Sequence, residues 1–133
     1  MSTGQYAKNN TVLGDDAMAN ALNPSQTIGY DNTAYGYNVL KNLQSNINEN
    51  SAFGSQALES AFGGENSAFG AFAGAEIGSG SENAMFGNWA GRFVGGKSNT
   101  ACGYRALAGD EGSNNIPGSS FATGGSNTAF VQR

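Results

Sequence analysis

Residues 66–70 read Asn-Ser-Ala-Phe-Gly, and the same pentad stands 16 residues earlier at 50–54. Variants of the form Asn-(Ser/Thr)-Ala-apolar-Gly recur at 10–14, 32–36, 83–87 and 99–103, and a truncated copy stands at 127–130. The first asparagines of the central copies are separated by 18, 16, 17 and 16 residues, and the outer gaps are 22 and 28. A unit this short cannot bury a core alone, so it must stack on its neighbours. The sequence therefore predicts an all-β, parallel β-solenoid of about six short coils with irregular terminal segments.

The structural positions of the repeat are its first asparagine and its closing glycine. They are Asn10, Asn32, Asn50, Asn66, Asn83, Asn99, Gly14, Gly36, Gly54, Gly70, Gly87 and Gly103. Both residue types tolerate the positive-φ corners of a tight coil, so each repeat is interpreted as two short strands with a turn after each. We expect the stacked asparagines to form an amide ladder. We also expect Tyr35, Phe53, Phe69 and Phe86 to stack from coil to coil, buried beside a row of alanines.

A helical alternative applies to two stretches. Asp15–Leu22 and Asn38–Leu43 have compositions that would suit a helical turn. Frequent glycines elsewhere disfavour a helical bundle, because each interior glycine costs about 1 kcal/mol relative to alanine.

The repeat divides the chain into three parts. Residues 1–9 are expected to form an N-terminal arm, and residues 10–112 the solenoid domain. Residues 113–133 are expected to form a loop insertion and a C-terminal capping segment. Within the last part, Ser113–Gly125 interrupts the period, which indicates either a docking arm or a flexible surface insertion.

The unit Asn-Thr-Ala-x-Gly-x-x-Ala-Leu, seen at 99–107, resembles repeats of phage tail fibres and of proteins that carry a C-terminal self-cleaving chaperone domain. It is also similar to the Ser-x-Ala-x-Gly head repeats of trimeric autotransporter adhesins, which build a left-handed parallel β-roll. The resemblance covers roughly residues 10–107 and returns at 127. It implies a left-handed β-roll and a homotrimer with three coils packed around one axis. The thin core of alanine and glycine also favours oligomerisation.

This resemblance implies a structural component of a bacteriophage virion, assembled in the host cytoplasm with other capsid or tail proteins as partners. About six coils rising ~4.8 Å each give a rod of only ~30 Å. A capsid decoration (cement) protein or a short tail-associated spike is therefore expected, rather than a long fibre, if Met1 is the natural start. The alternative is a receptor-binding tail-fibre or adhesin module that recognises a host-surface glycan.

Several classes of function are disfavoured by composition. The chain has no histidine, which argues against histidine-based catalysis, and we expect neither an enzyme nor a cofactor. The net charge is −4, and the six Lys and Arg residues are scattered, so nucleic acid is not an expected partner. No apolar run approaches the ~20 residues of a membrane span. The single cysteine, Cys102, cannot form an intrachain disulfide, and it is interpreted as a packed thiol rather than a nucleophile.

Two sets of side chains remain as candidate sites. An acidic residue precedes four of the asparagines, at Asp31, Glu49, Glu65 and Glu82. A Ca²⁺ site is conceivable there, but solvated charges at an exposed corner are favoured, and no metal is expected. The second set follows the pentad glycine and comprises Phe72, Trp89, Tyr104 and Arg105. Packing at a trimer interface is favoured for this set over a patch that binds carbohydrate or a partner protein.

Overall fold

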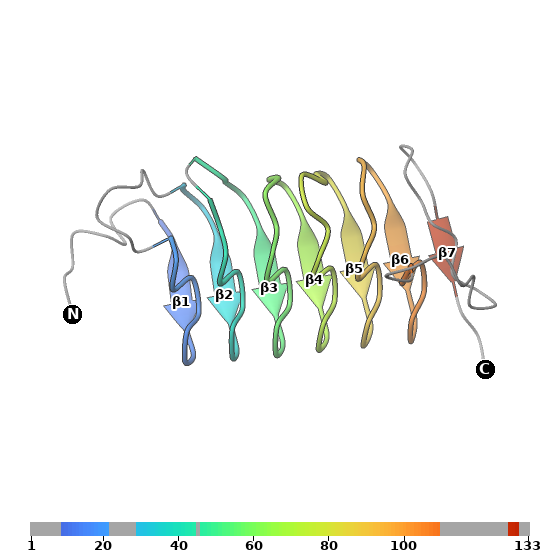
Figure 1. Ribbon diagram of the computed structural model, residues 1–133, viewed down its shortest axis with the longest axis horizontal. Helices are drawn as coiled ribbons and strands as arrows, with labels where there is room; N and C mark the ends of the chain where they lie inside the picture. The colour runs from blue at the N-terminus through green and yellow to red at the C-terminus, as the bar shows by residue number, and fades with distance from the viewer. Residues whose placement is uncertain (1–8, 22–28, 45, 110–127, 131–133) are drawn as a thin grey trace.

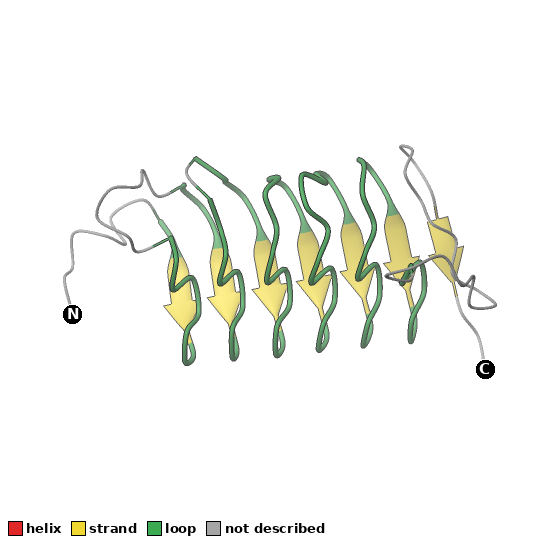
Figure 2. Ribbon diagram, in the orientation of Figure 1, coloured by secondary structure: helices red, strands yellow, loops and turns green. Residues whose placement is uncertain are grey.

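The structure is a computed structural model that describes residues 9–21, 29–44, 46–109 and 128–130. Seven three-residue strands form one parallel sheet, and their order in the sheet follows their order in the chain (Figure 1). The strands are β1 (Thr11–Leu13), β2 (Thr33–Tyr35), β3 (Ser51–Phe53), β4 (Ser67–Phe69), β5 (Ala84–Phe86), β6 (Thr100–Cys102) and β7 (Thr128–Phe130). The strands lie along one side of the stack and turns along the other, with no helix among the described residues (Figure 2). The predicted all-β, parallel β-solenoid is confirmed.

The register of the sheet is the register of the repeat. Across β3 and β4, Ser51 pairs with Ser67 and Phe53 with Phe69, so equivalent positions of successive coils lie side by side. The truncated last copy also joins the sheet, since β7 pairs with β6 and Thr128 stands opposite Thr100. Apart from Asn9 and β7, the predicted N-terminal arm and C-terminal segment lie outside the described residues.

The second side of each coil is not the second strand that the sequence predicted. Its backbone alternates in conformation, because the second and fourth residues after the pentad glycine have positive φ; in one coil these are Gln56 (φ 58°) and Leu58 (φ 49°). The Gln56 N–H donates to the Tyr37 carbonyl at 2.8 Å in the preceding coil, and the Leu58 N–H donates to the Ala73 carbonyl at 3.0 Å in the next. Each left-handed residue costs about 1–2 kcal/mol, which these hydrogen bonds between coils offset.

The same alternation excludes the helical alternative for the described parts of Asp15–Leu22 and Asn38–Leu43. Met18 and Leu40, near the middle of these stretches, have φ of 52° and 49°. An α-helix requires an unbroken run of negative φ near −63°. The described parts of both stretches are instead turns in which some N–H groups, such as those of Met18 and Leu40, bond to the neighbouring coil and others bond within the turn.

A ladder of buried asparagines runs through the solenoid, as the sequence predicted. The Asn66 Nδ2 donates to Asn50 Oδ1 at 3.1 Å and to the Gly80 carbonyl at 3.0 Å. The Asn66 Oδ1 accepts from both the backbone N–H and the Nδ2 of Asn83, each at 3.0 Å. The same paired contact links each neighbouring couple from Asn32 to Asn99. Each amide oxygen therefore joins the corner of one coil to the corner of the next.

In the core between the two sides, a larger residue on one side accompanies a smaller residue on the other. Three of the six coils that begin at Asn10 to Asn99 place alanine at the centre of the strand and leucine at the fourth position after the glycine, as in Ala52 and Leu58, both fully buried. Glycine replaces that leucine at Gly74 and Gly91, while β5 carries Met85 in place of alanine. A Cβ at Gly74 would lie 2.5 Å from the Met85 sulfur, and one at Gly91 would lie 2.8 Å from the same atom. Met85 thus fills the volume that leucines occupy elsewhere.

This compensation predicts that two harmful substitutions rescue each other. Met85→Ala should lower the free energy of unfolding by about 2–5 kcal/mol through the cavity it leaves. Gly91→Leu should also destabilise the chain, because the new side chain collides with Met85. The double variant recreates the alanine–leucine combination of other coils, and φ at Gly91 (59°) is close to that of Leu58. Urea unfolding should show the double variant to be more stable than Met85→Ala alone; additive losses would contradict the proposed packing.

The asparagine ladder predicts that removing the amide of one asparagine lowers the free energy of unfolding substantially. Asn66→Ala would leave the Gly80 carbonyl and the Asn83 N–H buried without these partners, at about 1–3 kcal/mol for each group. The neighbouring residue, Ser67, is half-buried with its side chain on the outer face, so Ser67→Ala should change stability by no more than about 0.5 kcal/mol. Chemical unfolding of both variants measures the difference. Equal losses would show that the ladder contributes nothing beyond packing.

Candidate interaction surface

The outer face of the sheet carries the aromatic residues, contrary to the expectation that they are buried. Side chains alternate across a strand, so the inward alanine at the strand centre forces its two neighbours outward. Tyr35, Phe69 and Phe86 are 54%, 38% and 43% exposed, and Phe53 is half-buried. The alanines form the core as predicted, and the aromatic rings lie on the opposite face of the same strands.

The prediction that these rings stack from coil to coil is confirmed. Ring centroids are 6.3 Å apart from Tyr35 to Phe53, 4.9 Å from Phe53 to Phe69 and 5.2 Å from Phe69 to Phe86. The two later pairs are nearly parallel, with interplanar angles of 7° and 5°. Because neighbouring rings cover each other's faces, this row presents mainly ring edges to its surroundings. Edges suit apolar packing against a protein better than stacking on a sugar.

The row continues past the aromatic residues at both ends. Leu13 is 57% exposed at the start, and Cys102 is half-buried at the end. We call the whole set the aromatic ridge; it consists of Leu13, Tyr35, Phe53, Phe69, Phe86 and Cys102. The interpretation of Cys102 as a buried thiol needs correction, because its position in the repeat points outward and the residue is only half-buried.

The acidic residues before the asparagines are exposed, as the favoured interpretation predicted. Asp31, Glu49, Glu65 and Glu82 all have positive φ, between 57° and 62°. The Ser98 hydroxyl donates to the Glu82 carboxylate at 3.1 Å. No group of three or more His, Cys, Asp or Glu side chains suited to a metal ion occurs in the described part of the chain.

Three of the four candidate side chains lie together on the turn side. The Phe72 and Trp89 rings are 5.2 Å apart and tilted by 38°, and the Arg105 guanidinium carbon lies 5.6 Å from the Trp89 centroid. Tyr104 is exposed and follows the pentad glycine directly, at the same repeat position as Tyr37. It therefore does not share the repeat position of the other three.

Sequence reasoning missed the residue at the centre of this cluster. The Arg92 guanidinium carbon lies 4.1 Å from the Trp89 centroid and 5.3 Å from that of Phe72. Its Nε and Nη2 both donate to Glu76 Oε1, at 3.2 and 2.8 Å. Glu76 and Arg92 are 16 residues apart, one fewer than the 17 that separate Asn66 from Asn83, and this spacing was the signal that places them in adjacent coils.

This arrangement acts as a clamp between coils. We call the set Phe72, Trp89, Arg92, Phe93 and Arg105 the arginine–aromatic cluster. Stacked guanidinium groups and a neighbouring ring surround Trp89, which is half-buried. A sugar requires an open ring face, so the cluster favours a structural role for Trp89 over a carbohydrate platform. The Nε of Arg105 is buried and has no hydrogen-bond partner within the described residues.

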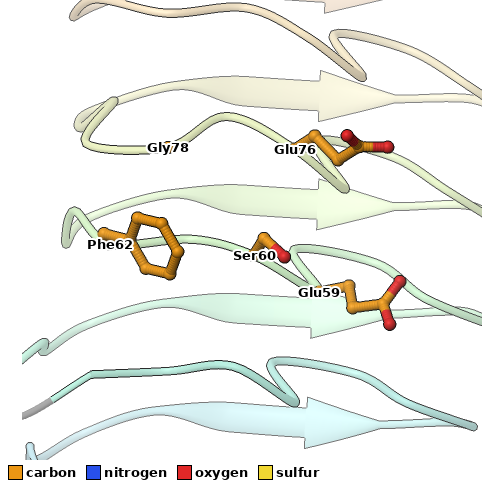
Figure 3. Close-up of a pocket in the computed structure, with 5 residues that line it drawn as sticks. All are labelled: Glu59, Ser60, Phe62, Glu76 and Gly78. Carbon is orange, nitrogen blue, oxygen red and sulfur yellow. The ribbon is translucent and has the colours of Figure 1, made fainter.

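A shallow recess lies beside this cluster, and sequence reasoning missed it as well. Glu59, Ser60 and Phe62 come from one coil, and Glu76 and Gly78 from the next (Figure 3). The recess has a volume of about 330 Å³ and opens to the surface. It brings two carboxylates, a hydroxyl and one aromatic ring together.

Comparisons with known proteins identify no relative from which a function could be inferred. A scan against protein-family models, a search of curated proteins and a search of solved structures each found no match. Among the described residues, no helix has the length and apolar character needed to span a membrane.

The clamp predicts that Arg92 stabilises the turn side. Arg92→Ala should lower the free energy of unfolding by about 1 kcal/mol and shift the emission of Trp89, the only tryptophan, to longer wavelength. Lys41 offers a matched control, since it forms an ion pair with Asp16 at 3.4 Å on the same side and contacts no ring in the described part. Lys41→Ala should change stability by less, because exposed ion pairs contribute little. Unchanged emission in Arg92→Ala would contradict the stacking.

Proposed function

We propose that this chain is a non-enzymatic structural protein of a bacteriophage virion, and that it works as a homotrimer of left-handed β-rolls. Its role would be that of a capsid decoration (cement) protein or a short tail-associated spike. The phage assignment comes from the resemblance of the repeat unit to phage tail-fibre repeats. The observation that carries the trimer is the exposed aromatic ridge.

The ridge has the properties of a buried contact. It is apolar, its rings are held in register by the sheet, and its side chains are substantially exposed in the single chain. A contiguous apolar surface of this kind marks an association site. Three copies arranged around one axis would cover their ridges mutually without any new element.

The distribution of charge is compatible with this contact. The acidic row, represented by Glu49 and Glu65, precedes the strands, whereas the ridge lies at their ends. The two rows therefore follow opposite ends of the same strands. Three copies that meet along the ridge need not bring their carboxylates into contact, so like-charge repulsion does not oppose the association.

The rest of the molecule fits a role based on shape. Hydrogen bonds join neighbouring coils on both the strand side and the turn side, and the asparagine ladder joins them at a third place. Such a rod resists bending and local opening. Cementing or capping a particle requires this rigidity and no moving part.

The trimer is tested by one charge placed in the ridge. Light scattering should give the native chain three times the monomer mass of 13.6 kDa, and Phe69→Glu should give the monomer, because the carboxylate would be buried among rings. Phe62→Glu is the matched control, since Phe62 is also 38% exposed but lies away from the ridge. It should remain a trimer. The Cys102 thiol should also react faster with a labelling reagent in Phe69→Glu than in the native chain.

A monomeric native chain, or a Phe69→Glu trimer, would contradict the ridge as the contact. The virion assignment has its own measurement. Gold-labelled antibody against the chain should decorate purified phage particles, along the shell for a cement protein and at the tail for a spike. Particles that carry no label in either place would overturn the assignment.

A further inference from the structure

We propose that the recess lined by Glu59, Ser60, Phe62, Glu76 and Gly78 binds an uncharged sugar unit. The recess lies between two adjacent coils, with Phe62 beside Gly78 at one end and the two glutamates at the other (Figure 3). This site goes beyond the structural role proposed above. It lies within one chain, so it does not depend on the trimer.

The Phe62 ring supplies a surface for stacking. It is 38% exposed, and in the described part of the chain no other ring stacks on it. The rings of the aromatic ridge cover one another, and a guanidinium covers Trp89. The face of an aromatic ring is electron-rich and attracts the weakly positive C–H groups of a sugar. Phe62 meets this condition and lies beside the polar groups that line the recess.

The two carboxylates are held in place and still have acceptor capacity. Glu59 accepts from Gln56 Nε2 through its Oε2 at 2.8 Å. Glu76 accepts both hydrogen bonds from Arg92 through its Oε1. Among the described residues, the other oxygen of each carboxylate has no hydrogen-bond donor and can accept from a sugar hydroxyl; such charge-assisted bonds are strong.

Ser60 adds a donor on the same coil as Phe62 and Glu59, and it lies between these two residues (Figure 3). Its Oγ accepts from Asn42 Nδ2 at 3.1 Å, so its own hydroxyl hydrogen remains available to a ligand oxygen. The recess then offers a ring face, two acceptors and one donor. A few placed polar groups beside an apolar surface are the usual composition of a small-ligand site.

Gly78 keeps the recess open. A Cβ at this position would meet no atom within 4 Å, so a side chain there would project into free space. Its φ of 57° matches that of Gln56 (58°), which shows that this fold accommodates a larger residue in the same conformation. Gly78→Asn should therefore occupy the recess without disturbing the coil.

The charge of the recess selects the class of sugar. Arg92 offsets the charge of Glu76, but Glu59 is hydrogen-bonded to an uncharged amide, so the recess keeps a negative charge that repels an anionic ligand; the net charge of −4 acts in the same direction. Sialic acid, uronic acids and phosphorylated sugars are therefore disfavoured. Neutral hexoses and N-acetylhexosamines are expected.

Saturation-transfer NMR of the full chain tests the site. The probes are glucose, galactose, mannose and N-acetylglucosamine, with glucuronic acid and N-acetylneuraminic acid as charged counterparts, each at millimolar concentration. At least one neutral sugar should receive signal, and the acidic sugars should receive none. Phe62→Ala should weaken binding at least tenfold, Gly78→Asn should abolish it, and Glu59→Gln should weaken it. Phe69→Ala, with the same residue type and exposure, should bind as the native chain does.

Three outcomes would overturn the site: no transfer to any neutral sugar, equal transfer to acidic sugars, or native affinity in Phe62→Ala. Loss of binding in Trp89→Ala but not in Phe62→Ala would place the sugar on the arginine–aromatic cluster and would also overturn it. Circular dichroism confirms that each variant is folded. Because Phe62→Ala should keep the native mass, failure of the sugar site is distinguishable from failure of the trimer.

Discussion

The structure depends on the contact between a buried asparagine and the same asparagine one coil later. From Asn32 to Asn83, each amide oxygen of the ladder accepts from both the backbone and the side chain of the next asparagine, as Asn66 does from Asn83. A slip of one residue would leave these buried groups without partners, at about 1–3 kcal/mol each, and would do so in every coil. The ladder therefore fixes the register, and the register determines which side chains stand next to one another. Residues as distant in sequence as Phe53 and Phe69 become neighbours for this reason.

Fixing the asparagine inward also determines the outer surface. The strand alternates its side chains, so the central alanine joins the asparagine inside, and the residue before the pentad glycine must point out. This parity places Phe69 on the surface although its residue type would suit the core. The fold gains an apolar surface as a direct consequence of its polar ladder. A thin solenoid with such a surface has reason to associate, because its interior alone contains mainly alanine and a few leucines.

Much of the fold could be predicted because, in a stacked repeat, equivalent positions of successive copies lie side by side. The pentad and its spacing identified the solenoid, the parallel register and the asparagine ladder. The turn side could not be predicted, because its alternating φ falls on Leu58 and Gln56 as well as on glycines, and neither type signals a left-handed residue. The outward position of the aromatic row could have been predicted, because side chains alternate between the two faces of a strand. Their apolar character instead favoured a place in the core. The Arg92–Glu76 pair was likewise encoded in the repeat spacing, although neither residue recurs from coil to coil.

The exposed rings of this chain differ in what covers their faces. Rings covered by other rings suit packing against a protein, whereas a ring with a free face suits stacking on a small ligand. In the aromatic ridge, Phe53 and Phe69 have a ring on each side, so their stacking is satisfied internally and mainly their edges remain for a partner. At Phe62 the next coil supplies Gly78, which has no side chain, so the ring keeps a free surface beside two held carboxylates. The equivalent position is Gln44, Phe62 and Gly95 in the other described coils, so its side chain varies from coil to coil. A glycine at this variable position is thus what leaves room for a small polar recess on the turn side, whereas the strand side carries the ridge proposed as the protein contact.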